Sequence, residues 1–293
     1  MWLVGFKAKS LPSLGSDVVL KERPNIGSQD EMANIRFVKE NTQIPIPSVI
    51  KEWTDDNDRH FVLMERIKGQ TLEDAWPTLS SSDKERIADQ VAKCLVQLRS
   101  LQSPQMRSLN HRPLYSGWLF LREPLTPHGP FTSETEFWDY LSFKLTKLPK
   151  EALARLRTRL PTSAPYTFTH GDLAFCNIIV KDGNLAGILD WEDAGYFPVW
   201  WEYVAATIGL DEGDAEWKAL LRGKLGYDCL EAKNFWRDFY SLHFYPDLDE
   251  AGQQLLETLL EDKKYQATAQ SIVYRKAVAW IHTFATNGKF APQ

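Results

Sequence analysis

The segment from residue 168 to residue 193 limits the fold of this chain more than any other. It reads FTHGDLAFCNIIVKDGNLAGILDWED, in which two short apolar runs, 177–180 and 185–189, flank a Lys-Asp-Gly-Asn turn. Apolar runs separated by such a turn predict a β-hairpin. A hairpin brings its two outer ends together, so Asp172 before it and Asp190 after it should lie at the same end.

The converging side chains admit two interpretations. Asp172, Asn177 and Asp190 offer two carboxylates and one amide oxygen, which suit a hard cation such as Mg²⁺. Alternatively, strand ends and turns simply favour Asp and Asn, and an isolated HGD tripeptide is often coincidence. The full pattern, H-G-D-x-x-x-x-N followed by a hairpin and I-L-D-W-E, matches the catalytic loop and later metal-binding Asp of protein kinases. By that logic one Asp accepts the proton of an attacking hydroxyl, while Asn and the second Asp hold Mg²⁺ on nucleotide phosphates.

A kinase also needs a cation on the nucleotide phosphates and a carboxylate to position it. The run VVLK places Lys21 at the end of an alternating strand, and Glu31 lies on the next helix. This is the order of the kinase strand lysine and helix glutamate. Two alternatives stay open: Glu31 is the third residue after Ser28 and would fit a capping box, and Lys21 could be a solvated lysine at a strand end.

The segment VLMERIKGQTL falls where a kinase has its hinge between lobes. We expect the backbone of Glu65 and Ile67 to pair with adenine, with Met64 at the back of the pocket. The alternative is an edge strand that leads into a loop. Ile178 and Ile188 would line the pocket floor, although apolar residues in a hairpin more often belong to the core.

The order of elements predicts an α+β, protein-kinase-like fold with two lobes. A strand over 16–22, a helix over 28–41 and a strand over 61–65 predict a small antiparallel-sheet lobe with one helix, spanning 1–68, in which 2–6 is a further strand. After a helix that begins at Ser82, with Ser82 and Glu85 as a capping box, the chain is mainly helical. The second lobe spans 69–293 and carries the catalytic hairpin within 168–193.

Composition excludes several classes of protein. The net charge of −5 and the absence of long Lys/Arg runs argue against nucleic-acid binding. The three cysteines form no CxxC pair, and no apolar run approaches the ~20 residues that span a bilayer. We therefore expect a cytoplasmic protein without membrane association, as a monomer or homodimer.

Five motifs together resemble those of a known family. They are VVLK, EMANIRFVKENTQIPIPSV, FVLMERIKGQTLEDAW, FTHGDLAFCNIIV and GILDWEDAGYFPVWWEY. The chain resembles the aminoglycoside phosphotransferase-like (APH / choline kinase-like) small-molecule kinases, in particular their large fungal branch of uncharacterised members. The resemblance implies a two-lobed kinase-like fold, ATP or GTP with Mg²⁺, and transfer of the γ-phosphoryl group to a hydroxyl of a small molecule.

The same resemblance implies roles for individual residues. The expected catalytic base is Asp172, the metal ligands are Asn177 and Asp190, the phosphate anchor is Lys21 with Glu31 as its partner, and His170 is structural within the catalytic loop. One feature departs from the pattern. Only Gly5 and Gly15 precede Lys21, so a glycine-rich phosphate loop is not evident.

The acceptor pocket of this family lies between the catalytic loop and the C-terminal helices. Glu192, Asp193 and Glu202 are the candidate acceptor contacts, and such an acidic pocket would suit an amine-bearing substrate. We expect residues 211–214 to form a solvated acidic face and most of the tryptophans to pack in the core. Two other functions stay open: a nucleotide-binding pseudokinase, and a repurposed kinase-fold enzyme of secondary metabolism.

Overall fold

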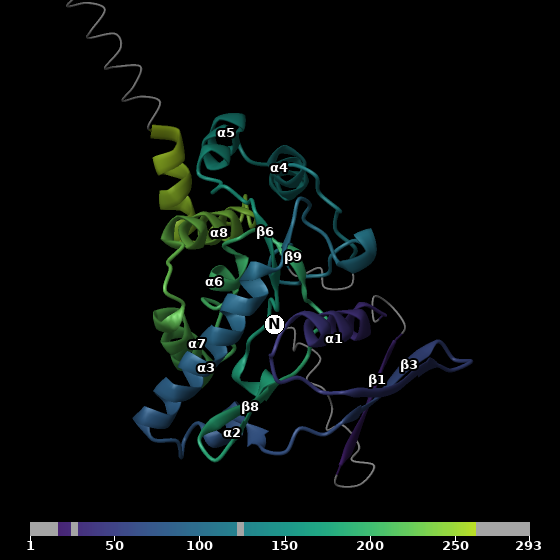
Figure 1. Cartoon of the computed structure of the whole chain (residues 1–293). Coiled ribbons are helices and arrows are strands. Elements are labelled where there is room, and N and C mark those ends of the chain that lie inside the picture. The colour runs from purple at the N-terminus through teal and green to yellow at the C-terminus, as the bar shows by residue number, and fades with distance from the viewer. Residues whose placement is uncertain (1–16, 25–28, 122–125, 262–293) are drawn as a thin grey trace, which may run out of the picture. The chain divides into compact units, whose positions relative to one another are not determined.

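The computed structural model describes residues 17–24, 29–121 and 126–261 (Figure 1). The chain divides into two compact units, Met1–Leu141 with Pro161–Asn234, and Ser142–Leu160 with Phe235–Gln293. The strands near the N-terminus and the catalytic hairpin belong to the same unit. The expected strand over 2–6, Gly5, Gly15 and Ser28 lie outside the described residues.

The first sheet is antiparallel and has the strand order β1-β3-β2. Its strands are β1 (Val18–Pro24), β2 (Val49–Thr54) and β3 (Arg59–Glu65). In β3 the side chains of His60, Val62 and Met64 are buried and alternate with more exposed ones, as expected of a strand with one covered face. Lys21 lies opposite Val62 in the register of β1 and β3. β2 is absent from the sequence prediction.

Among the described residues of this region, the helix is α1 (Gln29–Asn41), close to the expected range. Met32, Ile35 and Val38 are all buried, which confirms the predicted apolar face. Helical residues three or four apart lie on one side of the helix, so these three anchor α1 to the core. Glu31 is buried as well, with 2% of its surface exposed.

The predicted hairpin is present. It consists of β7 (Ile178–Lys181) and β8 (Asn184–Ile188), antiparallel, and joins the short β4 (Gln70–Thr71) in the order β4-β7-β8. Asp182 and Gly183 at its turn have φ of 51° and 68°. Two consecutive residues with positive φ form the turn type whose twist suits a two-residue hairpin. The turn is also held by Arg86, whose guanidinium donates to the Gly183 carbonyl oxygen at 2.8 and 3.0 Å.

A third antiparallel sheet leads into the loop that begins at residue 170. Its strands are β5 (Gln102–Ser103), β6 (Tyr166–Thr169) and β9 (Gly195–Phe197), in the order β5-β6-β9. Every residue of β6 is buried. The strand therefore holds the start of the catalytic loop, at residue 170, against the core.

The remaining described elements are helical. The α-helices are α2 (Leu72–Ala75), α3 (Ser81–Ser100), α4 (Glu134–Ser142), α5 (Lys150–Thr158), α6 (Trp201–Ala205), α7 (Glu212–Lys224) and α8 (Leu230–Leu242). Short 3-10 turns are η1 (Leu109–His111), η2 (Phe143–Leu145) and η3 (Phe175–Asn177), and residues 250–261 are also helical. In the described part of the chain, no helix is both long and apolar enough to span a bilayer.

The helical part differs from the sequence prediction at one helix start and agrees with it on the tryptophans. The N-cap of α3 is Ser80, whose side chain accepts from the Asp83 N–H, so the predicted box at Ser82 is wrong by two residues. Trp200, Trp201 and Trp217 are buried in the core, as expected for most of the tryptophans. Core packing therefore explains much of the high tryptophan content.

Candidate active site

The ends of the hairpin converge on the catalytic loop. Asn177, at the end of η3, donates from Nδ2 to the Asp172 backbone oxygen at 3.0 Å and to Asp172 Oδ2 at 3.4 Å. The Leu189 N–H donates to the Asn177 carbonyl oxygen at 2.8 Å, which places the returning strand beside the loop. The structure therefore brings Asp172, Asn177 and the residue before Asp190 into one place.

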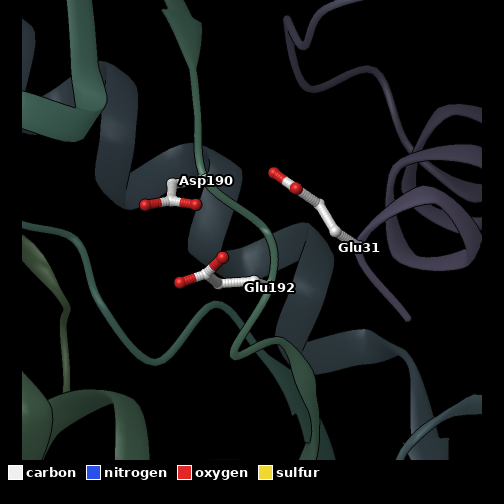
Figure 2. Close-up of side chains that lie close together, drawn as sticks. All are labelled: Glu31, Asp190 and Glu192. Atoms are coloured by element: carbon white, nitrogen blue, oxygen red, sulfur yellow. The ribbon is translucent and has the colours of Figure 1, made fainter. Parts of the chain in front are cut away.

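Lys21 lies among three carboxylates. Its Nζ is 3.1 Å from both oxygens of Glu31, 2.6 Å from Asp190 Oδ1 and 3.5 Å from Glu192 Oε2. One oxygen from each of Glu31, Asp190 and Glu192 lies within 4.8 Å of the others, and Figure 2 shows the three carboxylates near one another. The strand lysine and helix glutamate that the sequence paired are in contact, and they reach the hairpin as well.

Asp190 has an unusual backbone conformation. Its φ is +63°, in the left-handed region that non-glycine residues seldom occupy. Asp tolerates this region better than most residues, and such conformations persist where surrounding contacts impose them. The conformation turns the chain sharply between β8 and the 190–194 loop, and the Asp190 side chain meets Lys21.

His170 connects the catalytic loop to the returning strand. The Asp172 N–H donates to His170 Nδ1 at 3.2 Å, so Nδ1 is the acceptor nitrogen and the ring proton is on Nε2. That proton then points to the Leu189 carbonyl oxygen, 2.9 Å away. Burial lowers the pKa of His170 to about 4, so the ring is neutral at physiological pH. This geometry supports the structural role expected for His170.

Glu202 lies beneath the loop. Its Oε2 accepts the His170 backbone N–H at 2.7 Å, and only 8% of the residue is exposed. Burial raises the pKa of Glu202 to about 7. The carboxylate therefore binds the backbone of the loop, whereas the sequence suggested that it would contact the acceptor.

The other two candidate acceptor residues lie in the 190–194 loop. The Glu192 side chain is 45% exposed and close to Lys21. Asp193 lies against Gly171: a Cβ added to Gly171 would be 3.4 Å from the Asp193 backbone oxygen. Gly171 itself has a φ of +85°. Burial raises the pKa of Asp193 well above its usual range, and Glu192 adds to this effect.

Burial also raises the pKa of the expected base. The pKa of Asp172 rises to about 6, because the carboxylate loses solvation and Asp190 and Asp214 add negative charge, while Lys218 opposes the shift. A carboxylate of this kind is mostly ionised at neutral pH but binds a proton more readily than an exposed one. That property suits a group that takes a proton during a reaction.

The sequence analysis missed a buried ion pair that supports the loop. Lys218 Nζ lies 2.9 Å from Asp214 Oδ2, and Asp214 Oδ1 accepts the Phe175 N–H at 2.8 Å. Asp214 is fully buried, so the expected solvated face over residues 211–214 is wrong at this position. The spacing of four residues between Asp214 and Lys218, beside the apolar Trp217, is the signal that could have revealed the pair.

The residues predicted to contact the nucleotide at the hinge have different surroundings. Met64 is buried, and the Glu65 N–H donates to the Ser48 carbonyl oxygen at 2.9 Å, so an adenine contact through Glu65 would have to use its carbonyl oxygen. A Cβ at position 187 would overlap the Ile67 side chain, which packs directly on Gly187. Ile178 has no exposed surface, which favours a core role over the predicted pocket floor.

An antiparallel sheet with one helix, followed by a mainly helical part that carries the catalytic loop, defines a kinase-like fold. Solved aminoglycoside phosphotransferase structures share it. The GDP and kanamycin complex of an APH(2'') enzyme matches with a TM-score of 0.52 at 17% identity, covering 88% of this chain and 94% of that one. An APH(4) variant in complex with AMP-PNP and hygromycin B matches with a TM-score of 0.51 at 17% identity, covering 89% and 87%.

The sequence profile of the phosphotransferase enzyme family (APH) matches residues 17–237, so the chain belongs to that family. Among characterised relatives, an aminoglycoside 3'-phosphotransferase of Enterococcus faecalis is 25% identical over 220 residues, which are 71% of this chain and 73% of the relative. An aminoglycoside 3'-phosphotransferase of Staphylococcus aureus is 24% identical over the same extent.

Proposed function

We propose that this protein transfers the γ-phosphoryl group of ATP or GTP to a hydroxyl group of a small molecule. The observation that carries the proposal is the cluster in which Lys21 contacts Glu31 and Asp190 at 3.1 and 2.6 Å. These three residues come from β1, α1 and the segment after β8, and Leu189, the neighbour of Asp190, donates its N–H to the Asn177 carbonyl oxygen. Phosphoryl transfer depends mainly on positioning and on stabilising charge, and this cluster supplies both.

Each residue has a role in the proposed reaction. Asp172 accepts the proton of the acceptor hydroxyl, and the bond to Asn177 Nδ2 orients its carboxylate. Lys21 binds the nucleotide phosphates, and Glu31 holds it in position. Asp190 and Asn177 would hold Mg²⁺, which when bound neutralises charge on the transferred phosphoryl group.

The donor set fits a hard cation. Asp190 offers a carboxylate, and Asn177 bonds to Asp172 through Nδ2 rather than Oδ1, so that both proposed ligands present the oxygen donors that suit Mg²⁺. One oxygen from each of Glu31, Asp190 and Glu192 also lies within 4.8 Å of the others. In this arrangement the Lys21 ammonium neutralises them. When nucleotide phosphates engage Lys21, Asp190 gains the freedom to act as a metal ligand.

The metal, the nucleotide and the cellular setting stay predictions. The predicted metal is Mg²⁺ and the predicted nucleotide is ATP or GTP. The predicted setting is the fungal branch of the family and a cytoplasmic location. The names of the bacterial relatives and the kanamycin in one solved complex make amine-bearing hydroxyl compounds a sensible first group of acceptors to test. Glu192 and Asp193 are the acidic side chains of the loop that could contact such an amine.

The test is a screen of metabolite pools with γ-labelled ATP and GTP in the presence of Mg²⁺. The Asp172→Ala and Asp190→Ala variants serve as controls for contaminating kinases. We expect labelled product with the wild-type protein, and a loss of about 10²- to 10⁴-fold when the base is removed. Equal labelling by wild type and Asp172→Ala would contradict the proposal. Thermal stabilisation by Mg·ATP without any product would instead indicate a pseudokinase.

A further inference from the structure

Asn34 connects α1 to the loop that follows Asp190. It lies one helical turn after Glu31 and is fully buried. Its Nδ2 donates to the Trp191 backbone oxygen at 2.9 Å and to the Ala194 backbone oxygen at 3.0 Å. The two acceptors are 157 and 160 residues away in the sequence and lie on either side of Glu192 and Asp193. One side chain therefore bridges both ends of the short 190–194 loop.

The chemistry of the contact shows why an amide is needed there. Both loop atoms are carbonyl oxygens, so only the nitrogen of the Asn34 amide can face them. Its Oδ1 is buried without a hydrogen-bond partner among the described residues. An unpaired buried oxygen is unfavourable, and an apolar side chain of similar size would avoid it. Asn34 is therefore poorly explained as core packing and well explained by the two bonds that it donates.

The bonds within the loop do not fix its position on the protein. The Trp191 indole N–H donates to the Ile188 carbonyl oxygen at 3.1 Å, and the Ala194 N–H donates to the Trp191 carbonyl oxygen at 3.3 Å. The first joins the loop to the end of β8 and the second closes the loop on itself, so neither joins it to α1. Lys21 ties the Asp190 side chain to Glu31, but this link passes through the ammonium group that binds phosphates in the proposed function. Asn34 ties the backbone instead, through neutral groups that take no part in nucleotide binding.

We propose that Asn34 is a positioning residue that fixes the backbone of the 190–194 loop to α1. It keeps Asp190 at a set distance from Glu31 when nucleotide phosphates draw Lys21 away. The inference deepens the proposed phosphotransfer function and rests on it for its catalytic consequence. The structural tie itself is independent of any activity.

The tie is tested in the nucleotide-free protein by hydrogen–deuterium exchange of the amides in residues 190–197. Asn34→Leu keeps the volume and removes both donors. Asn34→Asp keeps the shape and places an oxygen where the nitrogen was. The control is Val38→Ala, one turn further along the same helix and fully buried, which weakens α1 packing but leaves both bonds donated by Asn34 in place. We expect faster exchange in both Asn34 variants and little change in the control. Unchanged exchange in the Asn34 variants, or an equal increase in Val38→Ala, would overturn the inference.

The catalytic consequence is read from kinetics with the labelled nucleotide. Asn34→Leu should raise the Mg²⁺ concentration that gives half the maximal rate, and it should lower kcat. Together the two effects should amount to about 10- to 100-fold, as for other residues that support metal ligands. The KM for the acceptor should change less than kcat does, because the bonds of Asn34 go to the backbone of Trp191 and Ala194. Asn34→Asp gives a second reading should Asn34→Leu fold poorly.

Two kinetic results would reject a positioning role. One is a loss of the same size in Val38→Ala, and the other is a change confined to the acceptor KM. If the wild-type protein shows no transfer at all, the proposed function fails while the exchange experiment still decides the tie.

Discussion

At the scale of single residues, Lys21 has the most demanding surroundings. Its ammonium lies within 3.5 Å of carboxylate oxygens from Glu31, Asp190 and Glu192. Its positive charge lies close to all three negative groups and reduces the repulsion between them. Besides its proposed role in binding phosphate, the lysine therefore helps to keep these carboxylates together in the nucleotide-free protein.

Removal of this lysine should turn the cluster into a metal site. In Lys21→Ala we expect MgCl₂ alone, without nucleotide, to raise the melting temperature more than it does in the wild type, because a divalent cation replaces the missing ammonium. Differential scanning calorimetry against NaCl of equal ionic strength measures the effect. Lys51→Ala, at an exposed position of β2, is the matched control. Identical Mg²⁺ shifts in all three proteins would contradict the expectation.

Glu202 should give the protein a pH-dependent stability. Burial raises its pKa from 4.5 to about 7 in the folded state, so the folded protein holds this proton more tightly than the unfolded chain. The contribution to stability is fully present below pH 4.5 and is lost as the pH rises through about 7. The loss is at most on the order of 3 kcal/mol.

The Glu202→Gln variant tests this expectation, since the amide keeps an oxygen for the His170 N–H but does not ionise. Relative to the wild type, the unfolding free energy of the variant should increase as the pH rises from about 5 to about 8, on either side of the shifted pKa. Urea titrations at several pH values measure the difference. Glu212→Gln on the exposed side of α7 should show no such trend, and a flat difference for Glu202→Gln would reject the assignment.

Sequence reasoning at this scale succeeded where spacing carries the information. The order of Lys21 and Glu31 along the chain predicted their contact, whereas the contact of Lys21 with Asp190 was not predicted. It failed for Asp214, because a run of acidic residues at a helix start resembles a solvated surface in sequence alone. Burial depends on what packs against the helix, and that information comes from segments far away in the chain.

At the scale of elements, α7 supports the catalytic loop through its buried ion pair. Asp214 accepts the Phe175 N–H, and the Trp217 indole N–H donates to the Leu173 carbonyl oxygen at 3.0 Å. The helix thus holds the loop backbone at two points on either side of Ala174. A helix outside the H-G-D-x-x-x-x-N motif therefore supports the backbone of that motif.

Breaking the pair should be costly. Asp214→Ala leaves the Lys218 ammonium buried without its carboxylate and removes the acceptor of the Phe175 N–H, so we expect a destabilisation of about 3–5 kcal/mol. Glu212→Ala, exposed on the same helix, should change the unfolding free energy by less than about 0.5 kcal/mol. Urea denaturation compares the two. A small effect of Asp214→Ala would show that the loop is held by other contacts.

Periodicity predicted some elements well and others poorly. The apolar stripes of α1 and α3 and the hairpin turn were clear in the sequence, because each has a strong local signal. β2 has mainly exposed side chains, so it lacks the alternation that reveals a half-buried strand. Its pairing with β3 is a tertiary contact, and local pattern does not report it. The N-cap of α3 was misplaced because three consecutive serines, at positions 80–82, lie at the start of the helix.

At the scale of the whole molecule, the predicted kinase-like fold is confirmed by the comparison with aminoglycoside phosphotransferase structures. The division into compact units adds a feature that the sequence did not suggest. All the residues that we assign to nucleotide and metal binding lie in the unit formed by Met1–Leu141 and Pro161–Asn234. Composition and periodicity do not change at residue 142 or 235, so the division depends on packing alone.

Nucleotide binding should therefore protect one unit selectively. With Mg·ATP, we expect slower hydrogen exchange at short times in residues 18–24, 61–67, 172–178 and 188–193, since binding suppresses local opening of the segments it contacts. Residues 142–160 and 235–261 should exchange as before. Mass-spectrometric exchange with and without nucleotide gives the comparison, and the Lys21→Ala protein is the control for weak binding. Protection centred on the second unit would contradict the proposed site.

The close packing of Ile67 on Gly187 makes this contact sensitive to the size of either residue. Because position 187 has no side chain, the volume beneath Ile67 is set by a single backbone position, and Gly187→Ala would push the Ile67 side chain from its place. Exchanging the sizes of these two residues would change the shape of the surface beside the proposed adenine position. Paired variants would carry a larger residue at 187 and a smaller one at 67. Such a variant could be matched to a modified nucleotide that other kinases do not accept, so that its reaction could be followed in a cell extract.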